Sequence, residues 1–276
     1  MKTINTLISK IALPKQFMLS AGIISALFQI PPVPQDYTKL SLPIQTASLT
    51  AGEIQTAQSS LSEIFFGSAI SPKTVDKIVD GQMAFVSSRK AYSASLSVIK
   101  KHENTIRINA KKQGVPEDVA LGVGLLENGG SETAKSSAGA LGVFQLMPGT
   151  ARSLGLTVNK KVDERKNPEK NIKAGMTYLA MNFERFGDWG LATWAYHAGE
   201  GNVSKALKIY AKANHNVNLP SVNKPSVIRD YVEKHAITIH KLLSDPSVKK
   251  FTRKLNDDSD GYPYKVIATS SLLKEI

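Results

Sequence analysis

The feature of this sequence that most constrains its fold is a helical spacing of apolar residues between clear start and stop signals. After Asn167 and Pro168, apolar side chains recur every three or four residues until Gly187, at Ile172, Met176, Leu179, Phe183 and Phe186. Asn favours the N-cap, Pro the first helical position, and Gly the residue after a helix end. The segment therefore predicts an amphipathic helix with one buried face.

Similar signals recur along much of the chain. They predict helices after Ser71-Pro72, over residues 90–112, from Pro116 to Gly129-Gly130, over 189–198 behind the cap Asp188, and after the cap Asn202. No convincing alternation of apolar and polar residues predicts a strand, although a small hairpin between residues 129 and 144 is left open. No internal repeat is visible. The expected fold class is mainly α.

Composition limits the classes of function. The 276 residues suffice for one domain with extensions, and a net charge of +12 predicts an acidic partner such as nucleic acid, an anionic membrane or cell-wall polymer. No nucleic-acid-binding motif accompanies that charge, so we expect no specific nucleic-acid partner. The absence of cysteine excludes disulfides, thiol catalysis and cysteine-based metal sites.

The first residues resemble an export signal. Lysines at positions 2, 10 and 15 precede an apolar stretch at 17–30, and "PPVP" follows. No clear cleavage site is present, so residues 1–34 are interpreted as an export signal or an N-terminal membrane anchor; an amphipathic helix packed on the domain is the alternative. We expect an exported protein of the periplasm or cell envelope, and membrane association through 17–30 is left open.

Residues 35–95 are predicted to form a linker or helical arm, because much of this part is rich in Pro, Ser, Thr, Gln and Ala and shows little periodicity. The main domain is expected to cover residues 96–276.

Glu127 is the principal candidate for catalysis. It follows the apolar run "ALGVGLL" and ends a predicted helix. The negative end of the helix dipole and the apolar neighbours Leu125 and Leu126 both disfavour an ionised carboxylate and raise its pKa. A carboxyl group still protonated near neutral pH can protonate a glycosidic oxygen. A solvated helix end is the ordinary alternative.

Several motifs follow Glu127 in order. Ser136 comes first, then "AGALG" at 138–142, "VFQ" at 143–145 and "LMP" at 146–148; "NIKAGMTYL" at 171–179 and "AYHAG" at 195–199 follow. Together they resemble the lytic transglycosylase family, whose lysozyme-like enzymes cut bacterial peptidoglycan. The chain departs from the family pattern at Asn128 in place of Ser, Phe144 in place of Met and His197 in place of Asn.

A last family element contains a tyrosine that is similar to Tyr262 in "DSDGYPYKVIA". "VIRDYV" would place this tyrosine at Tyr231 instead, but Val227 then stands where the family has an acid. Tyr262 is preferred. The resemblance covers residues 96–276.

The resemblance implies a goose-type, lysozyme-like helical domain and a reaction at the β-1,4 bond between N-acetylmuramic acid and N-acetylglucosamine. Glu127 would act as general acid and then as base, and the product would carry a 1,6-anhydro ring. No metal or cofactor is implied. Peptidoglycan glycan strands would be the partner of a monomeric enzyme, and the implied substrate-binding residues are Ser136, Gln145, Tyr196, His197 and Tyr262.

Two rival functions remain. A hydrolytic muramidase needs a second carboxylate, but residues 133–162 contain no Asp or Glu. Asp163, Glu164 and Glu200 are the nearest candidates for that second group, and Glu132 is a local rival to Glu127. The other alternative is a wall-binding module without catalytic activity.

Overall fold

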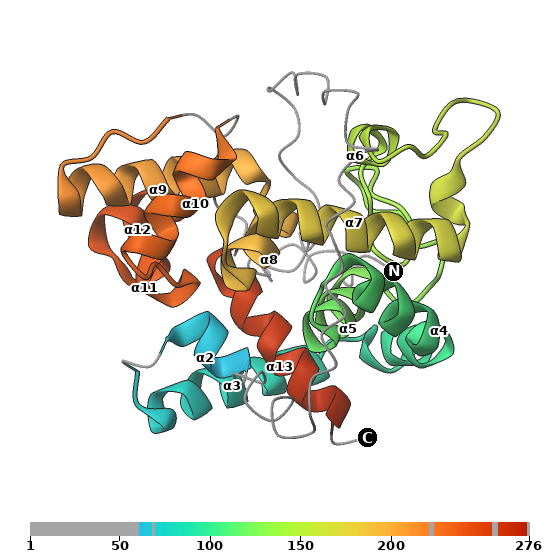
Figure 1. Ribbon diagram of the computed structural model, residues 1–276. Helices are drawn as coiled ribbons and strands as arrows, with labels where there is room; N and C mark the ends of the chain where they lie inside the picture. Colours follow the sequence, from blue (N-terminus) through green and yellow to red (C-terminus); the bar gives the residue numbers. More distant parts are fainter. Residues whose placement is uncertain (1–60, 68–69, 221–223, 256–258, 275–276) are drawn as a thin grey trace, which may run out of the picture.

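The structure is a computed structural model that describes residues 61–67, 70–220, 224–255 and 259–274. The prediction of a mainly α fold is confirmed (Figure 1). The α-helices are α2 (Leu61–Phe66), α3 (Pro72–Ser87), α4 (Tyr92–Gln113), α5 (Glu117–Glu127), α6 (Pro148–Ser153), α7 (Pro168–Phe186), α8 (Trp189–Ala198), α9 (Glu200–His215), α10 (Pro225–Lys234), α11 (Ile239–Ser244), α12 (Pro246–Thr252) and α13 (Tyr262–Lys274).

Helix α5 forms the centre of the core. All its residues from Val119 to Glu127 are buried, as expected of a helix that is apolar on every side. It packs between α4 and α13, and α13 also contacts α2, α3 and α8. Figure 1 shows α13, in red, crossing this part of the molecule next to α5.

A glycine allows α5 and α13 to touch at the level of their backbones. A Cβ atom on Gly122 would lie 2.6 Å from the Val266 carbonyl oxygen, and the Thr269 hydroxyl donates to the Gly122 carbonyl at 3.2 Å. The two helices run in opposite directions, since later residues of α5 lie beside earlier residues of α13. This packing brings Tyr262, at the start of α13, to Glu127, at the end of α5.

The helices α7 and α8 follow their predicted caps. The Asn167 side chain accepts from the Lys170 N–H, and the Asp188 side chain accepts from the Leu191 N–H. The predicted cap at Asn202 is wrong, because α9 already begins at Glu200 and the Asn202 amide donates to the Ala198 carbonyl oxygen. In place of the hairpin left open between 129 and 144, the described residues there form only isolated antiparallel bridges: Lys135 pairs with Leu141, which also pairs with Leu146.

The helices of the predicted arm belong to the same packed body as the rest. Phe65 and Phe66 of α2 and Val75, Val79 and Val86 of α3 join the main core. The expected boundary at residue 96 falls inside α4, so no linker separates the described residues 70–95 from the domain.

The predicted export segment, residues 1–34, lies outside the described residues. Across the ranges that are described, no helix has both the length and the apolar character needed to span a membrane.

Candidate active site

Glu127 occupies the last position of α5, and its side chain is buried. Burial raises the pKa of its carboxyl group to about 7, although the Tyr262 hydrogen bond and the positive charge of Arg89 both act to lower it. Both the protonated and the ionised form of this group are therefore accessible near neutral pH. A carboxyl group whose pKa lies near the working pH can donate a proton in one step and accept a proton in another.

Tyr262 contacts Glu127 directly. Its hydroxyl donates to Glu127 Oε1 at 2.7 Å, across 135 positions of sequence. The His197 ring stacks on the Tyr262 ring, with 4.3 Å between the ring centres and 10° between the planes. His197 thus braces the tyrosine from α8, in addition to the substrate contact expected of it.

The other candidate tyrosine lies elsewhere. Tyr231 belongs to α10, where its hydroxyl hydrogen-bonds His215 Nδ1 at 2.6 Å. Of the two, Tyr262 is the one that the fold brings to Glu127.

The segment after α5 is held in shape by Asn171, which is fully buried in α7. Its Oδ1 accepts from the Phe144 N–H at 2.7 Å, and its Nδ2 donates to the carbonyl oxygens of Leu141 at 3.0 Å and Arg165 at 3.1 Å. A Cβ on Gly142 would lie 2.3 Å from that Nδ2, and the φ of Gly142 is +92°, so glycine is required there.

Gln145 follows in this segment with a φ of +43°, a conformation uncommon outside glycine. Its side-chain nitrogen donates to the carbonyl oxygens of Ala134 at 2.7 Å and Gly142 at 3.0 Å. Since these bonds use its two N–H groups, Gln145 can present its amide oxygen to a substrate as an acceptor. Observed strain of this kind is typical of functional sites.

Ser136 shapes the turn before Gln145. Its Oγ accepts from the Ala140 N–H at 3.0 Å, and its own N–H donates to the Ala140 carbonyl at 2.9 Å. The half-exposed hydroxyl is thereby fixed in place.

Tyr196 links α8 to this segment. Its hydroxyl donates to the Phe144 carbonyl oxygen at 2.6 Å, and its ring packs on Tyr178 with 5.1 Å between centres. Burial, followed by the charge of Glu127, raises the pKa of Tyr196 well above its usual value. Tyr196 therefore stays neutral and acts in the structure as a hydrogen-bond donor near Glu127.

The other candidate carboxylates have cationic or hydroxyl partners. Glu132 pairs with Lys101 at 2.5 Å and His102 at 2.8 Å, Asp163 pairs with Arg165 at 2.8 Å, and Glu164 pairs with Lys170. These hydrogen bonds lower the pKa of Glu132, Asp163 and Glu164, so Glu132, the local rival to Glu127, lacks the raised pKa that a general acid near neutral pH needs. Glu200 accepts from the Tyr178 hydroxyl at 3.2 Å.

Arg89 is a residue near Glu127 that the sequence did not single out. It lies between α3 and α4, and its two terminal nitrogens both donate to the Leu126 carbonyl oxygen at 3.4 Å. No motif marks it, because it precedes the part of the chain that carries recognisable patterns.

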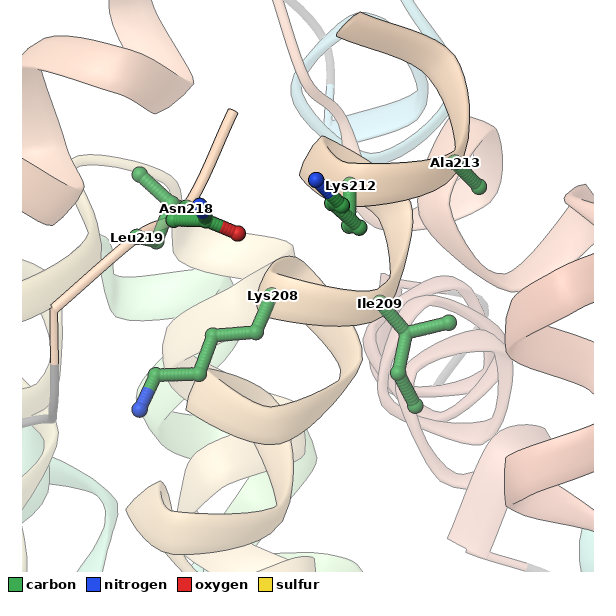
Figure 2. A pocket seen from close by; sticks show the side chains of 6 residues that line it. All are labelled: Lys208, Ile209, Lys212, Ala213, Asn218 and Leu219. Atoms are coloured by element: carbon green, nitrogen blue, oxygen red, sulfur yellow. The ribbon is translucent and has the colours of Figure 1, made fainter. Parts of the chain in front are cut away.

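Two further observations concern metal binding and the surface beside α9. Among the described residues, no group of three or more His, Cys, Asp or Glu side chains is placed to hold a metal ion. A hollow beside α9, lined by Lys208, Ile209, Lys212, Ala213, Asn218 and Leu219, contains none of the predicted site residues (Figure 2).

Comparison with known proteins gives a consistent family. Residues 104–218 match the Transglycosylase SLT domain. The chain is 30% identical over 125 residues to the membrane-bound lytic murein transglycosylase D of Escherichia coli K12, covering 45% of this chain and 27% of that protein. It is 34% identical over 127 residues to the transglycosylase of Enterobacteria phage PRD1, covering 45% of this chain and 46% of the phage protein.

Among solved structures, an inactive mutant of the lytic transglycosylase Slt from Pseudomonas aeruginosa matches at 25% identity and a TM-score of 0.35, over 56% of this chain and 24% of that one. The chain thus spans less than half the length of each of these relatives.

Proposed function

We propose that this chain, whose residues 104–218 match the Transglycosylase SLT domain, belongs to the lytic transglycosylase family and cleaves peptidoglycan as a lytic transglycosylase. The substrate is the β-1,4 bond between N-acetylmuramic acid and N-acetylglucosamine, and the product ends in 1,6-anhydro-N-acetylmuramic acid. The observation that carries this proposal is Glu127: a buried carboxyl with a pKa of about 7, hydrogen-bonded to Tyr262.

In the first step, protonated Glu127 gives its proton to the glycosidic oxygen as the bond from that oxygen to C1 of the muramic acid breaks. The acetamido group of the same sugar stabilises the positive charge that develops at C1. In the second step, ionised Glu127 takes the proton of the C6 hydroxyl, and O6 bonds to C1. Water is not consumed, and Glu127 is protonated again at the end.

One carboxylate suffices for this sequence because the nucleophile is already part of the substrate, which removes the entropic cost of recruiting one. The pairing of the other acids supports this mechanism: Glu132, Asp163 and Glu164 each form an ion pair with a Lys or Arg side chain. A hydrolase with two carboxylates would have to free one of them from its partner.

The supporting roles are proposed from position. Gln145 accepts a hydrogen bond from the glycan through its amide oxygen, and Ser136, Tyr196 and His197 line the glycan path. Tyr262 holds the Glu127 carboxyl in one orientation and stabilises its ionised form between the two steps.

We also propose that the protein acts in the periplasm or cell envelope, as a monomer on peptidoglycan strands. The names of its relatives include both membrane-bound and soluble lytic murein transglycosylases. Membrane attachment through residues 17–30 remains a prediction.

Mass spectrometry of the fragments released from purified peptidoglycan tests the reaction, with Glu127→Gln as the matched variant. We expect anhydro-ended muropeptides from the parent and none from the variant. Reducing-end fragments would instead identify a hydrolase. Intact peptidoglycan that retains bound, folded protein would identify a wall-binding module.

A further inference from the structure

Arg89 connects the region before the matched domain to the proposed catalytic acid. It lies 15 residues before residue 104, where the match to the Transglycosylase SLT domain begins. Its guanidinium donates twice to the Leu126 carbonyl oxygen, directly before Glu127, and its charge acts on the Glu127 carboxyl and on the Tyr262 hydroxyl.

The end of α5 creates a need for such a group. The last carbonyl oxygens of a helix have no partner within the helix and carry partial negative charge. Asn128 satisfies the Gly124 carbonyl through its N–H and its side-chain amide. The Leu126 carbonyl is satisfied by Arg89. The carboxylate formed when Glu127 gives up its proton would add a full negative charge at this end.

We propose that Arg89 is a positioning residue of the active site: it caps the last turn of α5 and supplies the positive charge that balances ionised Glu127. The inference rests on the proposed function of Glu127. It makes the connection between α3 and α4, which precedes the matched domain, a functional part of the enzyme.

The remaining groups around Glu127 do not provide this charge. Tyr262 from α13 and Tyr196 from α8 are buried, and both have a pKa well above the ordinary value, so they stay neutral. His197 from α8 stacks on the Tyr262 ring, with 4.3 Å between the ring centres. On α4, Lys101 and His102 are paired with Glu132.

The experiment compares the full chain with Arg89→Gln, Arg89→Lys and Lys90→Gln. Lys90 is the exposed neighbour, so its substitution removes one charge without touching α5. The rate of anhydro-muropeptide release is measured from pH 4.5 to 9.5. Because Glu127 must begin protonated, the rate falls as pH rises through its pKa, which is about 7 in the parent.

Loss of the Arg89 charge should raise the pH at which the rate falls to half its maximum, by on the order of 0.5 pH unit for a partly solvated charge. We expect that shift in Arg89→Gln, a smaller one in Arg89→Lys, and none in Lys90→Gln. Repeating the comparison in a His197→Asn background removes the imidazole as a second source of pH dependence.

A purely structural role would lower the rate of both Arg89 variants and leave the pH of half-maximal rate unchanged, which would overturn the proposal. A readout independent of activity is the titration of the Glu127 carboxyl carbon by NMR, assigned with Glu127→Gln. If the parent released no anhydro products, the proposed function would fail, but this titration would still decide whether Arg89 sets the charge state of Glu127.

Discussion

Replacing Tyr262 with Phe removes one hydrogen bond and little else. The hydroxyl donates to Glu127 Oε1 at 2.7 Å, while the ring that stacks on His197 is retained. The bond stabilises the ionised carboxylate more than the neutral acid, since it lowers the pKa of Glu127 against the effect of burial. The substitution should therefore raise that pKa.

The magnitude follows from the energy of the bond. A hydrogen bond to a charged group contributes about 1.5–3 kcal/mol, and about 1.4 kcal/mol corresponds to one pKa unit. Starting from about 7, the pKa of Glu127 should rise by about 1–2 units in Tyr262→Phe. If proton transfer is nearly complete in the transition state, the same lost energy slows the acidic plateau about 10- to 100-fold.

The assay is the initial rate of muropeptide release from sub-saturating peptidoglycan across the pH range. The parent should lose half its rate near pH 7, where Glu127 ionises. Tyr262→Phe should be slower at pH 5 and should keep its plateau to higher pH. Tyr264→Phe is the matched control, because it removes the same atom from the same helix, where that hydroxyl bonds His240 Nδ1 at 3.0 Å.

Two results would refute this reasoning. An unchanged alkaline limb in Tyr262→Phe would mean that the bond does not set the pKa of the working acid. A shift to lower pH would mean that the hydroxyl favours the neutral acid.

Three other substitutions test separate parts of the site. The pKa of Glu127 in the folded protein exceeds its ordinary value, so its contribution to stability is present below about pH 4.5 and lost as pH rises to about 7. In urea unfolding, the free energy of unfolding of Glu127→Gln should increase relative to that of the parent by up to about 3 kcal/mol between pH 4 and pH 8. An equal difference between the two proteins at both pH values would contradict this. Glu132→Gln should keep the muropeptide release rate within about threefold, because this acid is ion-paired on the surface; loss of activity in folded protein would make Glu132 the catalyst. Asn171→Ala should lower the free energy of unfolding by about 3 kcal/mol or more, since it leaves the Phe144 N–H and two carbonyl oxygens without a hydrogen-bond partner. A change below about 1 kcal/mol would show that water replaces the amide.

Local patterns predict the helices α3 to α5 and α7 to α9, but none of the helices α10 to α13. The helix behind Asp188 was expected over 189–198 and is observed as Trp189–Ala198, because the cap and the terminal glycine both act within a few residues. The end of α5 at Glu127 is similarly local, as are the apolar neighbours that bury the acid. Asn202 shows the limit of such patterns: its side chain can cap a helix, but here it lies in the first turn of α9 and donates to the Ala198 carbonyl oxygen at the end of α8.

The partners of Glu127 are set by tertiary packing, which local patterns do not contain. Tyr262 was anticipated only through a family resemblance, and Arg89 carries no pattern at all. Where the sequence predicts a site residue, it does not predict the hydrogen bonds of that residue. The Gln145 side-chain nitrogen donates to the carbonyl oxygens of Ala134 and Gly142, which leaves the amide oxygen as an acceptor for the substrate.

The pKa of Glu127 is therefore a property of the assembled fold. The residues that adjust it come from the α3–α4 connection and from α13, and burial by the core provides the largest effect. If α13 separated from α5, the carboxyl would lose the Tyr262 bond and gain access to water, and its pKa would return toward that of an ordinary glutamate. Such a residue would be ionised at neutral pH and unable to start the reaction. The backbone contact at Gly122 thus does more than stabilise the core, since it keeps a single carboxyl able to act first as an acid and then as a base.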